Sequence, residues 1–149
     1  MIKIIINETD QCRIFIEIYL TKYYNNKKGD TQMTLEECYN KFGGDYKLVL
    51  SRLMMDKIVD RFIRKFLDDP SYNLLITSLN DKNYEEAFRA AHTLKGLCLN
   101  LCLDGLLNPV MELTEALRGG VGPAPQHLVE KTSAQYELTC SSIREYINQ

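Results

Sequence analysis

The sequence predicts an all-α protein, with an antiparallel four-helix bundle, an additional short N-terminal helix and a C-terminal helix. Apolar residues recur at helical spacing over most of residues 33–149. Capping residues and acidic first turns mark where the individual helices begin. The connections between these segments are short, which favours neighbouring helices that run antiparallel.

The first predicted helix begins at a capping box formed by Thr34 and Glu37, and the glycines at 43–44 end it. Asp45 then caps a long segment, which is either one helix or two helices broken near Met55. The apolar residues at helical spacing in this segment are Leu50, Leu53, Met54, Ile58, Phe62 and Phe66.

Three further helices are predicted before the C-terminus. Pro70 is suited to start an amphipathic helix that ends at Asn80, and residues 83–101 form a strongly periodic helix. Pro109 leaves two possibilities for the next helix: Asn108 caps a helix that starts at the proline, or a helix from Asp104 is kinked there.

The last predicted helix covers residues 126–147, after a flexible connection at 119–125. Its apolar positions include Leu128, Tyr136, Leu138 and Ile143. Residues 1–32 differ, because "IKIIIN" is β-branched and "NNKKGDTQ" resembles a linker. We therefore expect residues 33–149 to be the helical domain. Residues 1–32 are then an appendage of uncertain structure, or the product of an upstream translation start.

Composition limits the classes of partner. The chain has 149 residues, enough for one domain, and its net charge of −2 gives no basic stripe for nucleic acid. No apolar run approaches the ~20 residues of a membrane helix, and the N-terminus does not read as a signal peptide. The cysteines are odd in number and irregular in spacing, so we expect them to be reduced: Cys12, Cys38, Cys98, Cys102 and Cys140. Reduced cysteines favour a cytoplasmic protein, and we expect it to be a monomer.

The helix at residues 83–101 carries a histidine, His92, away from its core side. At 3.6 residues per turn, one stripe faces the core: Tyr84, Ala87, Ala91, Leu94, Cys98 and Leu101. His92 lies in a different column, with Glu85, Phe88, Arg89, Lys95, Gly96 and Leu99. Its imidazole should therefore face solvent, where it is competent as a nucleophile or as an acid or base.

The neighbours of His92 in this column suggest a docking face. Lys95, one turn away, can stabilise negative charge on a phosphoryl group at the ring. Gly96 costs about 1 kcal/mol relative to alanine inside a helix, which suggests that a second protein approaches closely there. Phe88 and Leu99, with Arg89, would give that partner its contact surface. Phe88 and Leu99 fit the edge of a wide core stripe equally well, and a single surface histidine usually has no function.

Other candidate sites, for a metal ion or for a catalytic triad, have less support in the sequence. Cys98 and Cys102 could be imagined as metal ligands together with His92, but the helical wheel places both cysteines on the core side. We interpret them as small buried side chains. His127 follows Pro125 at a helix start and is expected on the surface, and one usable histidine does not make a Ser/His/Asp set.

The run "AHTLKGLCLNL" in an all-helical chain resembles the histidine-containing phosphotransfer domain family of bacterial phosphorelays. The resemblance in order and spacing covers roughly residues 33–118. It implies a four-helix bundle with His92 as phosphoacceptor, Lys95 as electrostatic partner and Gly96 as clearance for a receiver domain. The family commonly has glycine ten residues after the histidine, where this chain has Cys102. The acidic residue that follows the histidine of sensor-kinase dimerisation helices is absent, since Thr93 comes next.

The resemblance predicts a phosphorelay intermediate that takes a phosphoryl group from a receiver aspartate onto His92 and passes it to another receiver. The expected partners are receiver domains of response regulators or hybrid histidine kinases. The chain has no Gly-rich ATP-binding boxes, so the donor must be another protein. We expect no cofactor in this chain, with magnesium in the partner receiver. The alternative is a non-catalytic helical adaptor that binds a receiver or kinase without accepting phosphate.

Overall fold

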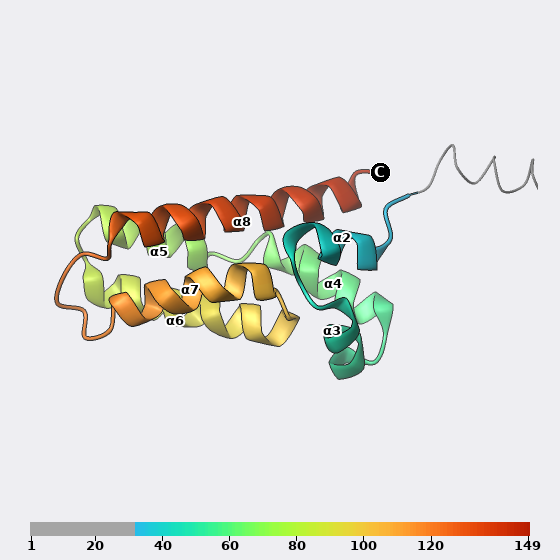
Figure 1. Cartoon of the computed structure of the whole chain (residues 1–149), viewed down its shortest axis with the longest axis horizontal. Coiled ribbons are helices and arrows are strands. Elements are labelled where there is room, and N and C mark those ends of the chain that lie inside the picture. Colours follow the sequence, from blue (N-terminus) through green and yellow to red (C-terminus); the bar gives the residue numbers. More distant parts are fainter. Residues whose placement is uncertain (1–31) are drawn as a thin grey trace, which may run out of the picture. The chain divides into compact units, whose positions relative to one another are not determined.

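The computed structural model describes residues 32–149, and Met33–Gln149 form one compact unit (Figure 1). All regular elements in this part of the chain are α-helices, which confirms the predicted all-α class. They are α2 (Leu35–Phe42), α3 (Tyr46–Leu53), α4 (Asp56–Phe66), α5 (Ser71–Asn80), α6 (Tyr84–Leu101), α7 (Asp104–Ala116) and α8 (Gln126–Ile147). None of these helices is long and apolar enough to cross a membrane. The predicted appendage at 1–32 lies outside the described residues, except for Gln32, and stays a prediction.

The predicted caps of the first helices are confirmed. Thr34 Oγ1 accepts a hydrogen bond from the Glu37 amide at 3.2 Å, and the Glu37 carboxylate accepts one from the Thr34 amide at 2.7 Å. Gly43 ends α2 in the left-handed conformation, with φ of 74°. The Asp45 side chain then accepts from the Leu48 amide at 2.9 Å and caps α3.

The long segment after Asp45 is two helices rather than one. Met54 adopts a left-handed φ of 65°, and α4 begins after Met55. Of the apolar residues at helical spacing in this segment, Met54 is 79% exposed and Phe62 is 40% exposed. The break rotates α4 relative to the phase of α3, so one helical wheel cannot describe both. The buried side chains of these two helices are Val49, Val59, Ile63 and Phe66.

The helices α5, α6, α7 and α8 pack against one another in chain order, each against the next. The ring of Tyr72 in α5 stacks on Tyr136 in α8 with 3.7 Å between centroids, which joins the last helix of this series to the first. Among the apolar positions named for α8, Tyr136 and Ile143 are buried, whereas Leu138 is exposed. The largest fully buried side chains from these helices are Leu75, Leu94, Leu106, Leu113 and Ile143.

The turn between α2 and α3 is fastened to the junction of α6 and α7. The Asp45 amide donates to the Cys102 carbonyl at 2.9 Å, and the Gly105 amide donates to the Gly43 carbonyl at 3.0 Å. A Cβ at Gly105 would lie 2.1 Å from the carbonyl oxygen of Phe42, so only glycine fits at this crossing. These backbone contacts fix the C-terminal end of α6, the helix that carries His92.

Pro109 lies inside α7, which starts at Asp104. Of the two possibilities left open by the sequence, the structure therefore shows a helix that runs from Asp104 through the proline. Because Pro109 has no N–H group, the carbonyl of Gly105 lacks the donor that a helix normally provides four residues later.

Candidate functional site

The helix α6 is built as the sequence predicts. The Asn83 side chain caps it by accepting from the Glu86 amide at 3.2 Å, and acidic residues occupy its first turn. Its buried residues are Ala87, Ala90, Ala91, Leu94, Cys98 and Leu101. The predicted core stripe is thus confirmed except for Tyr84, which is only half-buried, and Ala90 belongs to it as well.

His92 is exposed on the opposite side of α6 from the core stripe, as predicted. Its ring lies beside that of Phe88, with 6.1 Å between centroids and a tilt of 38°. Phe88 is half-buried and packs against the core, whereas Leu99 is 46% exposed. The sequence left open whether these two residues belong to the core edge or to the surface. Phe88 lies at the edge of the core, whereas Leu99 lies on the surface.

Lys95 lies on the side of α6 that faces α7. It is half-buried, and within residues 32–149 it takes part in none of the salt bridges. A hydrogen bond from Arg118 lowers the pKa of the Glu115 carboxyl on α7, and the charge of Lys95 contributes a little to the same direction. Lys95 is thus near Glu115 without pairing to it, so its ammonium group can serve an incoming anion.

Arg89 is exposed and already engaged within α6. Its guanidinium bonds the Glu85 carboxylate at 2.5 Å and lies 3.5 Å from that of Glu86. Such exposed pairs contribute little to stability. They do neutralise the charge of Arg89, which leaves Lys95 as the stronger cation beside His92.

Gly96 has open space where a side chain would be. An added Cβ would meet no atom within 4 Å outside the local helix backbone, in contrast to Gly105. Among the described residues, nothing in the packing of the chain therefore requires glycine at this position. Within residues 32–149, there is therefore room for an added group at this position, one turn from His92.

Cys102 ends α6 in the left-handed conformation, with φ of 53° and ψ of 44°. The amides of Cys102 and Leu103 both donate to the carbonyl of Cys98. Glycine adopts this conformation without the steric cost that a Cβ brings, so this position suits glycine. The turn therefore forms with cysteine as well, and the Cys102 side chain is buried.

Side chains from α2 and α3 hold the last turn of α6, where helix carbonyls have no partner within the helix. Arg52 Nη1 donates to the Leu99 carbonyl at 2.7 Å, and the Tyr39 hydroxyl donates to the Leu101 carbonyl at 3.0 Å. Sequence reasoning missed both residues. Arg52 is 47 residues from Leu99 and Tyr39 is 62 residues from Leu101, so no local spacing in the sequence indicates these contacts.

The cysteines and the second histidine lie as the sequence predicted. Cys98 and Cys102 are buried while His92 is exposed, so the three side chains do not converge on one ion. Burial raises the pKa of the Cys98 thiol to about 12, which disfavours the thiolate that a metal needs. His127, at the start of α8, is exposed.

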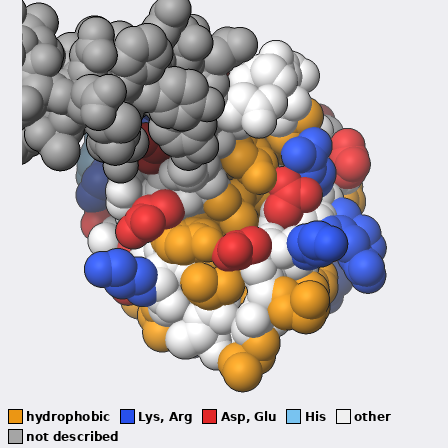
Figure 2. All heavy atoms as spheres, turned by 90° about the vertical axis from the view of Figure 1, so that its right-hand side faces the viewer, with side chains coloured by type: hydrophobic (Ala, Val, Ile, Leu, Met, Phe, Trp, Pro, Cys, Tyr) orange, Lys and Arg blue, Asp and Glu red, His pale blue; other side chains and the backbone are white. Residues whose placement is uncertain are grey.

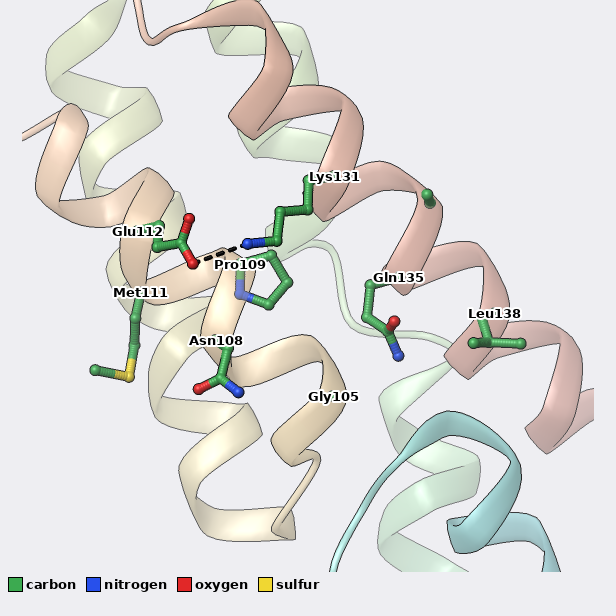
Figure 3. A pocket seen from close by; sticks show the side chains of 9 residues that line it. Gly105, Asn108, Pro109, Met111, Glu112, Lys131, Gln135 and Leu138 are labelled. Atoms are coloured by element: carbon green, nitrogen blue, oxygen red, sulfur yellow. Dashed lines mark hydrogen bonds and ion pairs between the residues drawn. The ribbon is translucent and has the colours of Figure 1, made fainter.

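A hollow of about 750 Å³ lies between α7 and α8 (Figure 3). The ion pair of Lys131 with Glu112 crosses it at 2.9 Å, and no residue of α6 lines it. His92 instead stands on the outer face of a helix. Such a position suits reaction with a group that another protein presents, because the partner can then supply the rest of the site.

Comparison with known proteins identifies the class to which this fold and face belong. The model of the Hpt domain family matches residues 61–148, which is more than half of the chain and includes His92, Lys95 and Gly96. The chain therefore belongs to the Hpt domain family, whose members act in phosphorelays of two-component signalling and interact with receiver domains. Neither curated proteins nor solved structures gave a match.

Proposed function

We propose that this chain is a phosphorelay intermediate that accepts a phosphoryl group on His92 from a receiver aspartate and passes it to a second receiver. The observation that carries the proposal is the outer face of α6, where an exposed imidazole, an ammonium group that forms no salt bridge within residues 32–149 and a glycine with open space around it follow one another along the helix. Membership of the Hpt domain family supports it.

In the proposed reaction, the lone pair of one imidazole nitrogen of His92 attacks phosphorus in line. The N–P bond forms while the P–O bond to the receiver aspartate breaks, and its electrons stay with the departing carboxylate. The second ring nitrogen then releases its proton to water. Lys95 stabilises the phosphoryl oxygens, while Gly96 and Leu99 allow close approach and contact. The receiver contributes its own magnesium, and this chain needs no cofactor.

The remaining helices support this face. In the proposal, α5 to α8 form the antiparallel four-helix bundle of the family, since they pack in order and Tyr72 meets Tyr136. The protein acts in the cytoplasm as a monomer, with one accessible histidine face to engage one receiver at a time.

A second candidate is a non-catalytic adaptor that binds a receiver or kinase through the same face. The exposed Leu99 and the open space at Gly96 favour it, because both serve binding whether or not His92 reacts. The two candidates make the same contacts and differ only in covalent chemistry.

Labelling separates the candidates. Receiver domains charged with radioactive phosphate are mixed with wild type, His92→Gln and His127→Gln, the last being a matched control at another exposed histidine. Phosphotransfer predicts acid-labile, alkali-stable label on wild type and His127→Gln, with none on His92→Gln. Equal labelling of His92→Gln and wild type contradicts the assignment, and binding of all three proteins without label establishes the adaptor.

A further inference from the structure

Arg52, in the last turn of α3, reaches the C-terminal end of α6. Its Nη1 donates a hydrogen bond to the Leu99 carbonyl at 2.7 Å. Arg52 is exposed, and within residues 32–149 it forms no salt bridge and no other hydrogen bond. Because Nη1 makes this contact, the edge of the guanidinium formed by Nε and Nη2 is open. That edge fits a carboxylate, with two parallel hydrogen bonds.

Arg52 lies at one edge of the outer face of α6 that carries His92, Lys95, Gly96 and Leu99, which we call the His92 face. Leu99 follows His92 by seven residues (99 − 92). Seven residues are about 20° short of two helical turns, so both point to the same side of α6. A rise of ~1.5 Å per residue, with the carbonyl and the hydrogen bond added, places the guanidinium about 15 Å from His92 along the helix. A typical interface covers about 800 Å² per partner, a disc of about 16 Å radius. A protein centred on His92 therefore has Arg52 at its rim.

The charges along the His92 face are ordered from one end to the other. The acidic residues of α6 lie in its first turn, where Arg89 offsets part of their charge, and no acidic residue follows His92 in the helix. Lys95 follows His92, but the last turn of α6 has no basic residue of its own. Arg52 supplies the cation at that end from α3. A cation near helix carbonyls also stabilises the helix, so a test must separate this effect from binding.

The end of the molecule formed by α2, α3 and α4 is not a basic patch. Figure 2, which views this end, shows lysine and arginine side chains interspersed with acidic and hydrophobic ones. A surface of mixed charge lacks the basic stripe that nucleic acid requires. The charge of Arg52 is therefore suited to a local pair with one carboxylate rather than to a broad attraction of anions.

We propose that Arg52 pairs with a carboxylate at the rim of the receiver domain that docks on His92, and that this pair helps to set the direction in which the receiver lies along α6. The inference rests on the proposed function for the identity of the partner. The occupant is the receiver because a body centred on His92 reaches Arg52. Charges of opposite sign at the two ends of a docking face fix the orientation of a partner, and rim charges act mainly on the rate of association.

Binding to His92→Gln tests the pair without chemistry. The probe is the receiver domain that binds this variant most tightly, titrated in about 20 mM and about 1 M salt. Adding Arg52→Gln removes the charge but keeps a donor for the Leu99 carbonyl, and we expect Kd to rise about two- to fivefold in low salt. The difference should nearly vanish in the high salt, where the Debye length is about 3 Å. Arg52→Lys should retain most of the affinity.

The matched control is Arg144→Gln, added to His92→Gln in the same way. Arg144 is an exposed arginine of α8 that forms no salt bridge within residues 32–149, and α8 packs mainly against α2 and α7. This control should bind the receiver as His92→Gln does. Thermal unfolding verifies that each variant is folded.

The inference and the proposed phosphotransfer fail on different results. Equal Kd with and without Arg52→Gln in low salt overturns the pair and leaves phosphotransfer standing. A loss of affinity that is the same at both salt concentrations also overturns it, because Arg52 then only holds the end of α6. A loss that high salt removes supports the pair even where wild type takes no label from the receiver, a result that refutes only phosphotransfer.

Discussion

Replacing Gly96 with alanine should stabilise the protein. Gly96 lies inside α6, and the added methyl group meets no atom within 4 Å outside the local helix backbone. The substitution therefore gains the helix propensity of alanine over glycine, about 1 kcal/mol, without any clash within residues 32–149. For a domain of this size, that gain raises Tm by about 4 °C.

The same substitution should impair exchange with the receiver. The new methyl group projects from the His92 face, one turn along the helix, where the partner is expected to approach closely. Overpacking at a tight contact typically costs about 1–3 kcal/mol, and each 1.4 kcal/mol is a factor of about ten. We therefore expect Gly96→Ala to slow phosphotransfer at low receiver concentration by about tenfold or more.

Urea unfolding and transfer kinetics measure the two effects on one preparation. Gly122→Ala is the matched control, because an added Cβ at Gly122 also meets nothing within 4 Å but lies in the connection between α7 and α8. That control should transfer phosphate at the wild-type rate. The reasoning is refuted if Gly96→Ala is less stable than wild type, which would mean that the site is not open, or if it is more stable and transfers normally.

Three further predictions concern stability and are measured by urea unfolding. Gly105→Ala should destabilise by about 1–3 kcal/mol because its Cβ would meet the Phe42 carbonyl, and a neutral effect would contradict the tight crossing. Cys102→Gly should be about 1 kcal/mol more stable than Cys102→Ala, the reverse of the usual helix order, since the left-handed conformation penalises a Cβ. The hydrogen bond from Arg64 lowers the pKa of Asp60, so this carboxylate stabilises the fold above its unfolded pKa and that contribution is lost as pH falls through the lowered folded pKa. Asp60→Asn should accordingly be less stable than wild type at pH 7, with the difference shrinking in acid below about pH 4, and a difference independent of pH would count against the pair.

The sequence predicted the helices best where their ends carry chemical signals. The capping box at Thr34, the cap at Asp45 and the Gly43 terminus all formed as expected. The break at Met54 was only one of two possibilities, because neither glycine nor proline marks it. Helical spacing of the apolar residues did not show which of them are buried, and Phe62 is exposed. Local signals define helix ends, but the direction of a helix after a break depends on its packing.

The candidate site was predicted as far as one helical wheel reaches. The wheel correctly exposed His92 and buried Cys98, since both follow from the core stripe of α6. The wheel could not show that Phe88 is half-buried and Leu99 exposed, because the width of the buried stripe depends on how neighbouring helices pack around α6. Arg52 was beyond its reach for a different reason, since it comes to α6 from 47 residues away.

Two residues of α6 contradict helix preferences, and the structure accounts for them differently. Cys102 occupies a left-handed position that suits glycine, but its side chain is buried and its carbonyl accepts from Asp45, so the packing of the chain compensates for the strain. Gly96 occupies a helical position that suits alanine, and no contact within the described residues benefits from the missing side chain. Folding alone would favour alanine at this position. The approach of a second protein, one turn from the exposed His92, would explain why glycine is present instead. The unexplained glycine is therefore stronger support for the docking face than the histidine, because surface histidines need no special reason to be present.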